Sequence, residues 1–227
     1  MKTIRGCIFL AVFACATPAL AEEGFEKIFN GKDLSGWRGN TKLWSVEDGA
    51  ITGKTTAEDP IPFNTFLIWD DGKVADFELT FVYRIVDGNS GVQYRSKVLN
   101  EKDFVVGGYQ ADIDATMKFA GINYEEKGRG ILAQRGQRVT IAEDGKKSVE
   151  KFGEAEELGK KIKAEKWNSY RLVAKGNTLS HYINDTLMSE VIDSQKDKAA
   201  SEGVLAFQIH RGPPMVIQFK DIMLKKH

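Results

Sequence analysis

Side chains that can carry chemistry alternate with apolar ones in three short segments, GVQYRS, GYQADID and GVLAFQIHRG. In an extended strand, residues two apart point to the same face. The residues that share a face in this way are Gln93 and Arg95, then Gln110, Asp112 and Asp114, and then Gln208 and His210. The spacing therefore predicts strand faces that carry amide, guanidinium, carboxylate and imidazole groups.

Two interpretations of these polar faces stay open. Antiparallel strands often expose a polar face to water, and such a face is typically built from lysine, glutamate, serine and threonine. The groups present here differ from that composition, and the last segment runs directly into the rigid Arg211-Gly212-Pro213-Pro214. A concave functional face is an equally good interpretation.

Several chemistries fit these residue types. Asp112, Asp114 and His210 can act as ligands to a divalent cation, because two carboxylates suit calcium and an added imidazole suits a transition metal. The two carboxyl groups can instead serve as acid and base on a glycosidic bond. His210 can be a general base, or a histidine held by hydrogen bonds at the end of a strand.

Composition excludes other classes of function. The chain has 32 cationic and 32 anionic residues, a balance that argues against nucleic acid as a partner. No phosphate-binding loop, dinucleotide fingerprint, HExxH motif or nucleophile elbow is present in the sequence.

The elements that must position these groups are strands. Period-two alternation is clearest in FELTFVYRIV, and glycine-containing turns such as Asp87-Gly88 separate the alternating segments. These segments are residues 43–52, 77–86, 91–96, 108–114, 130–141, 167–174, 178–184, 203–210 and 215–224. We predict an all-β fold, an antiparallel sandwich or jelly roll. The charged segment 147–166 is predicted to be a surface loop with a short helix.

The first residues have the order of parts of an export signal. Lys2 and Arg5 precede an apolar run, and Ala19-Leu20-Ala21 offers a cleavage site. We predict a signal peptide over residues 1–21 and one domain over residues 22–227, exported to the periplasm or secreted. The apolar run is too short to span a bilayer, and no later segment is long and apolar enough.

Both cysteines of the chain, Cys7 and Cys15, lie inside the predicted signal. The exported domain would therefore have no thiol for metal binding, disulfide formation or nucleophilic attack. Val12-Phe13-Ala14-Cys15 loosely fits a lipobox, so lipidation at Cys15 is the alternative in which the domain stays anchored to a membrane.

The chain resembles the 3-keto-disaccharide hydrolase domain family, which has a concanavalin-A-like jelly-roll fold. The resemblance spans nearly all of the predicted domain. The segments that carry it, in family order, are GFEKIFNGKDLSGWRG, NSGVQYRS, GGYQADID, RGILAQRG, WNSYRLVAKGNTLSHYIND and GVLAFQIHRGPPMVIQFKDIMLKK. The sequence departs from the family pattern at Gln110, where a glutamate is usual, and at Asn184-Asp185, where Asn-Gly is common.

The resemblance implies action on sugars already oxidised at C3. The ketone acidifies the C2 proton, so a base can remove that proton, the C1 substituent can leave by elimination, and water can then add. Such a reaction needs a base, a group that stabilises the enolate oxygen, and an acid for the leaving group.

Roles for the chain's own residues follow from the matched segments as expectations. His210 is assigned as the base, Arg95 with a divalent cation as the enolate stabiliser, and Asp112 or Asp114 as metal ligand or acid. Substrate-binding roles are assigned to Gln93, Gln110, Gln208 and Arg211. The alternatives are a non-catalytic carbohydrate-binding module of laminin-G type and a structural or adhesive domain whose polar face is solvated.

Overall fold

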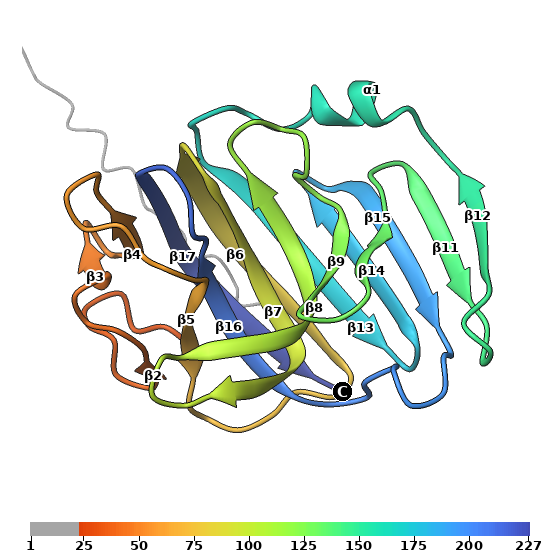
Figure 1. Cartoon of the computed structure of the whole chain (residues 1–227), viewed down its shortest axis with the longest axis horizontal. Helices are drawn as coiled ribbons and strands as arrows, with labels where there is room; N and C mark the ends of the chain where they lie inside the picture. The colour runs from red at the N-terminus through yellow and green to blue at the C-terminus, as the bar shows by residue number, and fades with distance from the viewer. Residues whose placement is uncertain (1–22) are drawn as a thin grey trace, which may run out of the picture.

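The computed structural model describes residues 23–227, which form two β-sheets packed against each other (Figure 1). The predicted signal peptide, its cleavage site after Ala21 and the lipobox at Cys15 lie outside the described residues. The predicted all-β sandwich is confirmed. Among residues 23–227, no helix is long and apolar enough to cross a membrane.

The larger sheet contains ten strands. They are β1 (Glu26–Lys27), β3 (Trp44–Glu47), β4 (Ala50–Thr55), β6 (Phe77–Val86), β11 (Gln137–Ile141), β12 (Lys147–Lys151), β13 (Asn168–Lys175), β14 (Thr178–Ile183), β15 (Thr186–Asp193) and β17 (Met215–Lys226). Their order is β12-β11-β15-β14-β13-β6-β17-β4-β3, and β1 pairs with β17. All neighbours are antiparallel except β11 and β15, which run parallel.

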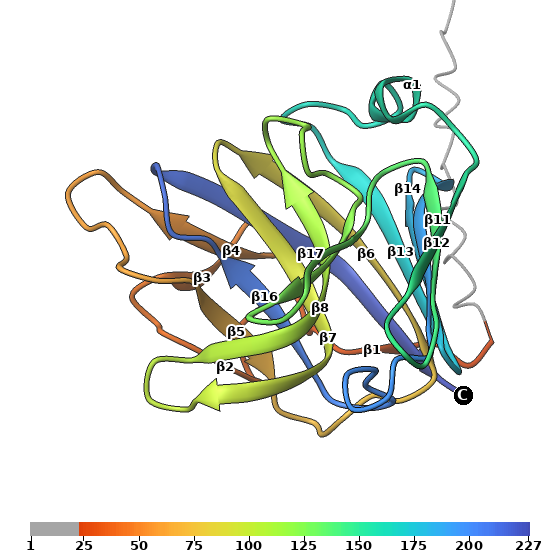
Figure 2. The same ribbon diagram turned by 45° about the vertical axis from the view of Figure 1, so that its right-hand side comes forward.

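The smaller sheet contains seven strands. They are β2 (Trp37–Arg38), β5 (Thr65–Trp69), β7 (Asn89–Asn100), β8 (Val105–Asp114), β9 (Asn123–Glu126), β10 (Gly130–Ala133) and β16 (Val204–Ile209), in the order β10-β9-β8-β7-β16-β5-β2. Figure 2 shows β7, β8 and β16 in a layer in front of β6, β13 and β17. The three polar segments identified in the sequence therefore lie on three adjacent strands.

Strands whose two faces have different surroundings are the ones that alternation identifies. In β6 every second side chain is buried, beginning with Phe77, as the sequence pattern predicts. By contrast, all five residues of β5 are buried, so Thr65–Trp69 has no polar face to alternate and was not among the predicted strands. β9 and β15 were also missed.

Segment 147–166 contains both a strand and the predicted helix. The helix α1 (Ala155–Gly159) is short and has no buried residue, and it lies outside both sheets in Figure 1. Residues Lys147–Lys151 form β12, which is exposed along its whole length and pairs only with β11 at the edge of the sheet. Its charged side chains suit an exposed edge strand, because charge there discourages pairing with other chains.

Stacked aromatic rings join the two sheets. Phe207 of β16 lies 4.1 Å from Phe219 of β17, measured between ring centroids, and Trp37 of β2 stacks on Phe207 at 4.9 Å. Phe207 and Phe219 have at most 1% of their surface exposed. This contact fixes the strand that carries Gln208 against the opposite sheet.

We expect Phe207→Ala to lower the free energy of unfolding by about 3–5 kcal/mol, because it removes a large buried ring and leaves a cavity. Urea denaturation followed by tryptophan fluorescence measures this change. Val149→Ala is the control, since Val149 is 57% exposed, and it should change stability by no more than about 0.5 kcal/mol. Equal effects of the two substitutions would contradict the stacking as the joint between the sheets.

Candidate functional site

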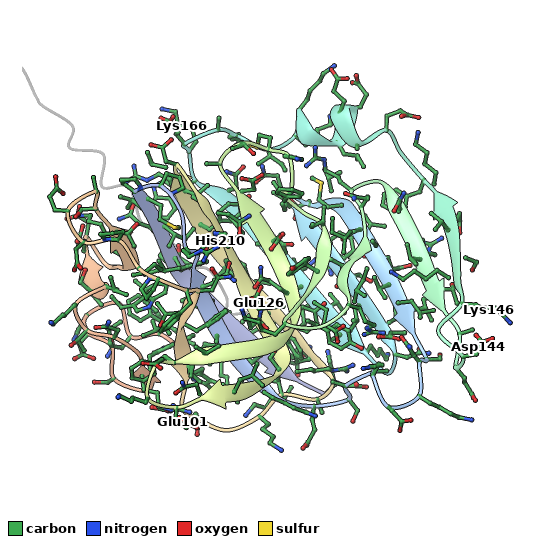
Figure 3. All side chains as sticks on the ribbon, viewed as in Figure 1. Glu101, Glu126, Asp144, Lys146, Lys166 and His210 are labelled. Atoms are coloured by element: carbon green, nitrogen blue, oxygen red, sulfur yellow. The ribbon has the colours of Figure 1, made fainter. Side chains whose placement is uncertain are left out.

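A cavity of about 840 Å³ opens on the outer face of the smaller sheet. Its polar lining comes from β8, β9, the β6–β7 turn and the segment after β16. These polar residues are Asp87, Asn89, Gln110, Asp112, Asp114, Thr116, Tyr124, Glu126, His210 and Arg211. Apolar side chains complete the wall, namely Phe119, Ile122, Ile131, Pro213 and Pro214. Figure 3 labels His210 and Glu126 on this face, far from Asp144 and Lys146.

The outer polar face of β7, β8 and β16 is buried rather than solvated. Gln93 and Gln208 have no exposed surface, and Gln110, Asp112 and Asp114 are at most 5% exposed. The interpretation of this face as ordinary water-exposed strand surface is therefore wrong.

Three glutamines form one hydrogen-bonded unit beneath the cavity. Gln93 and Gln208 both donate from Nε2 to Oε1 of Gln110, at 2.7 and 3.0 Å. The Nε2 of Gln110 in turn donates to Oδ1 of Asp112. Gln93 and Gln208 do not line the cavity, so they hold Gln110, which does.

Gly91 provides the space that Gln110 occupies. The two residues lie on neighbouring strands, and a Cβ at Gly91 would come within 2.6 Å of Cγ of Gln110. Only a residue without a side chain therefore lets Gln110 lie across β7 toward Gln93.

The surroundings of Asp112 strongly change the pKa of its carboxyl group. Burial raises its pKa well above the ordinary value, the hydrogen bond from Gln110 opposes that shift, and the negative charges of Asp114 and Glu126 add to it. Its Oδ2 has no hydrogen-bond partner among residues 23–227. The group is therefore held in its protonated, neutral form over a wider pH range than an exposed aspartate. In that form it can donate a proton into the cavity.

Asp114 lines the same cavity but is occupied by the turn that follows it. Its Oδ1 accepts the backbone N–H of Thr116, and its Oδ2 accepts the Thr116 hydroxyl and the backbone N–H of Phe119, at 2.7 and 2.8 Å. The carboxylate thus shapes the 114–119 loop that closes one side of the cavity.

Asn64 connects Glu126 to the segment that carries His210. Its Nδ2 donates to Oε1 of Glu126 at 3.1 Å, and its Oδ1 accepts the backbone N–H of Arg211 at 2.9 Å. His210 is half-buried at the cavity wall, and neither of its ring nitrogens has a hydrogen-bond partner within residues 23–227. Both ring nitrogens are therefore available to a bound molecule.

The predicted shared face of Gln93 and Arg95 is wrong. Pairing between β7 and β8 shifts after Tyr94, and Arg95 has a left-handed φ of 46°, so the strand bulges there. The Arg95 guanidinium instead donates to the Ala75 and Gly176 carbonyls and to Asp76, at 2.7–2.8 Å. Arg95 does not line the cavity that contains His210.

The described residues give the metal hypothesis no ligand cluster. Within residues 23–227, no group of three or more histidine, cysteine, aspartate or glutamate side chains is gathered closely enough to hold a metal ion. Asp112, Asp114 and His210 share the cavity without forming such a group, and both oxygens of Asp114 already have partners.

Sequence reasoning missed Tyr124 and Glu126. They lie on one face of β9, which pairs with β8 so that Tyr124 is opposite Gln110 and Glu126 is opposite Gly108. Burial raises the pKa of Tyr124, as do the charges of Glu126 and Asp112, so its hydroxyl stays protonated. The alternation in NYEE indicated a strand with Tyr124 and Glu126 on one face. The sequence did not indicate its register with β8.

The chain matches one family model over nearly its whole described length. The model of the 3-keto-alpha-glucoside-1,2-lyase-like domain covers residues 24–225. A search of curated protein sequences gave no match.

Solved structures with the same fold share little sequence. A candidate glycosyl hydrolase from Parabacteroides distasonis is 21% identical, with a TM-score of 0.58, over 92% of this chain and 98% of its own. The carbohydrate-binding module CBM66 from Bacillus subtilis is 17% identical, with a TM-score of 0.56, over 84% and 96%. A Bacillus subtilis protein with a galectin-like fold is 9% identical, with a TM-score of 0.54, over 85% and 90%. These likenesses support the concanavalin-A-like sandwich.

We expect Asp112→Asn to remove a pH-dependent loss of stability. Because the folded-state pKa is raised, the stabilisation from a protonated Asp112 is fully present below the unfolded pKa of about 4 and is lost as pH rises toward the folded value. The asparagine variant should therefore gain stability relative to the wild type as pH rises from 4 to 8 in urea denaturation. A difference between the two proteins that does not change with pH would contradict the raised pKa.

We expect Arg95→Met to destabilise the fold by about 3 kcal/mol or more, since it leaves buried carbonyl groups without a donor. Urea denaturation measures the change. Arg138→Met is the matched control, because the Arg138 side chain is about one-third exposed and its ion pairs are screened by water, so its loss should cost much less. Unchanged stability of Arg95→Met would show that the hydrogen bonds of its guanidinium do not hold the fold.

Proposed function

The chain belongs to the 3-keto-alpha-glucoside-1,2-lyase-like domain family, and from that membership we propose that it is an exported enzyme that cleaves 3-keto-glycosides. The cleavage would proceed by removal of the C2 proton and elimination at C1, with hydration as a following step. The family gives the chain a carbohydrate-active role. The observation that carries the proposal is one cavity lined by both the buried Asp112 and His210, whose ring nitrogens have no partner within residues 23–227.

His210 is the proposed base. The C2–H bond breaks, the proton passes to a ring nitrogen, and the electron pair forms the enolate between C2 and the C3 oxygen. A neutral imidazole suits this task because its unprotonated ring nitrogen can accept a proton. The absence of a competing partner within residues 23–227 leaves the nitrogen free to accept the proton.

Tyr124 replaces Arg95 as the proposed stabiliser of the enolate oxygen. Tyr124 lines the cavity, and the raised pKa of its hydroxyl keeps the donor proton in place. A hydrogen bond to developing negative charge strengthens in a site with little water. Arg95 is excluded from this role because its guanidinium is committed to Asp76 and to main-chain carbonyls.

Asp112 is the proposed acid for the leaving group. When the enolate collapses, the C1–O bond breaks and the departing oxygen takes the proton of Asp112, which leaves the carboxylate paired with Gln110. The raised pKa keeps this group protonated before the reaction. Gln93 and Gln208 contribute by holding Gln110 in the orientation that faces Asp112.

The test compares two leaving groups on the same 3-keto-glucoside, an acidic nitrophenol and a sugar. His210→Gln should lower kcat/KM by about 10²- to 10⁴-fold on both substrates, because both require removal of the C2 proton. Asp112→Asn should lower kcat/KM strongly for the sugar and only weakly for nitrophenol, which leaves without a proton. Chromatography and nitrophenol absorbance measure the products.

Matched controls are His227→Gln and Asp144→Asn, two exposed positions outside the cavity. Full turnover by His210→Gln would overturn the assignment of the base. Binding of a glycan without any product from either substrate would instead indicate a non-catalytic carbohydrate-binding module. Dialysis against a chelator, followed by readdition of a divalent cation, tests the metal hypothesis in the same assay.

A further inference from the structure

A second, smaller cavity of about 200 Å³ adjoins the main one. It is lined by Phe63, Asn64, Lys127, His210 and Arg211. His210 and Arg211 also line the main cavity, so the two cavities share one wall. A molecule bound in both would place the bond between its two parts beside His210.

The two cavities differ in charge. The main cavity is lined by four carboxyl groups, Asp87, Asp112, Asp114 and Glu126, with Arg211 as its one guanidinium. The small cavity is lined by two cations and no carboxyl group. Substrate hydroxyls can donate to the acids of the first, whereas the second favours an anion.

The charge of Lys127 is only weakly offset by its neighbours. Its Nζ lies 4.0 Å from Oε1 of Glu126, and that oxygen already accepts the Asn64 amide. The Lys127 side chain is 53% exposed, so its ammonium can turn toward a bound anion. Arg211 is exposed as well, and its only side-chain hydrogen bond within residues 23–227 is to the Pro62 carbonyl at 3.5 Å.

Phe63 adds an apolar surface to the small cavity. It is 39% exposed and is one of three large hydrophobic side chains that are exposed among the described residues. A ring in this position can pack against the flat face of a sugar or of an aromatic group. The cavity therefore combines a ring platform with two cations.

We propose that the small cavity is the leaving-group subsite and that it selects 3-keto-glucosides whose leaving group carries a carboxylate. This inference rests on the proposed function and names the substrate class of that site. The oxidised sugar occupies the acid-lined cavity, the leaving group lies on Phe63, and its carboxylate meets Lys127 and Arg211. The carboxylate can belong to a uronic acid residue or to an aromatic acid, and the assay separates the two.

The experiment uses two matched substrate pairs. The first pair is the 3-keto-glucosides of 4-hydroxybenzoate and of neutral 4-hydroxybenzamide, and the second joins 3-keto-glucose to glucuronic acid or to glucose. We expect kcat/KM to favour the acid over its neutral partner by about fivefold or more, which corresponds to about 1 kcal/mol. The pair with the larger ratio identifies the source of the carboxylate. The preference should shrink as salt is raised.

Variants test whether the small cavity causes the preference for the acid. The acid-to-neutral ratio should fall to about one in Lys127→Met/Arg211→Gln, and Lys127→Glu should reverse it, because a carboxylate then faces the substrate acid. Lys146→Met makes the same chemical change at a distant exposed site and should keep the wild-type ratio (Figure 3). A ratio of one in the wild type, or an unchanged ratio in the variants, would overturn the proposal.

Binding of the free acids separates this proposal from the proposed function. Calorimetry should detect glucuronate or 4-hydroxybenzoate with the wild type and a weaker interaction with Lys127→Met/Arg211→Gln. Turnover of both members of a pair without preference, together with equal binding by wild type and variant, overturns the subsite and leaves the enzyme assignment standing. Charge-dependent binding without turnover overturns the enzyme assignment and supports the anion site.

Discussion

The site depends on one constraint, that polar side chains buried under the outer face of the smaller sheet need hydrogen-bond partners. A buried amide or carboxyl group without a hydrogen bond costs stability, and Gln110 meets this requirement for its neighbours. It accepts from Gln93 and from Gln208 and donates to Asp112. Three strands are thereby tied together by side-chain hydrogen bonds in addition to their main-chain pairing. Among residues 23–227, Oε1 of Gln208 and Oδ2 of Asp112 are the oxygens of this group left without a partner.

The sequence was most informative where a strand has two different faces. FELTFVYRIV alternates because one face of β6 packs on the aromatic core and the other does not. The common face of Gln110, Asp112 and Asp114 was predictable for the same reason, since β8 continues without a bulge through those residues. The local alternation of side chains was sufficient to predict the two faces of a strand wherever the backbone stayed regular.

The local sequence pattern did not predict bulges or strand register. Arg95 follows Gln93 by two residues, but a left-handed backbone angle turns it toward Asp76 and reverses the expected face. Glu126 enters the cavity because β9 pairs with β8 in one register, and a shift of one residue would move Tyr124 and Glu126 to the other face. Both features depend on contacts between segments far apart in the chain, so the periodicity of a single strand does not predict them.

The arrangement of acids has an energetic cost that fits the proposed role of Asp112 as a proton donor. Asp112 is buried near Asp114 and Glu126, and this placement opposes its ionisation and reduces stability at neutral pH. A site that only holds sugar hydroxyls gains nothing from a carboxyl group kept neutral, because an amide of the same size would accept and donate hydrogen bonds without that cost. A proton donor gains directly, since the same burial that opposes ionisation keeps the transferable proton in place. The Gln110 amide fits this role, because it supplies a donor beside Asp112 without adding a further negative charge.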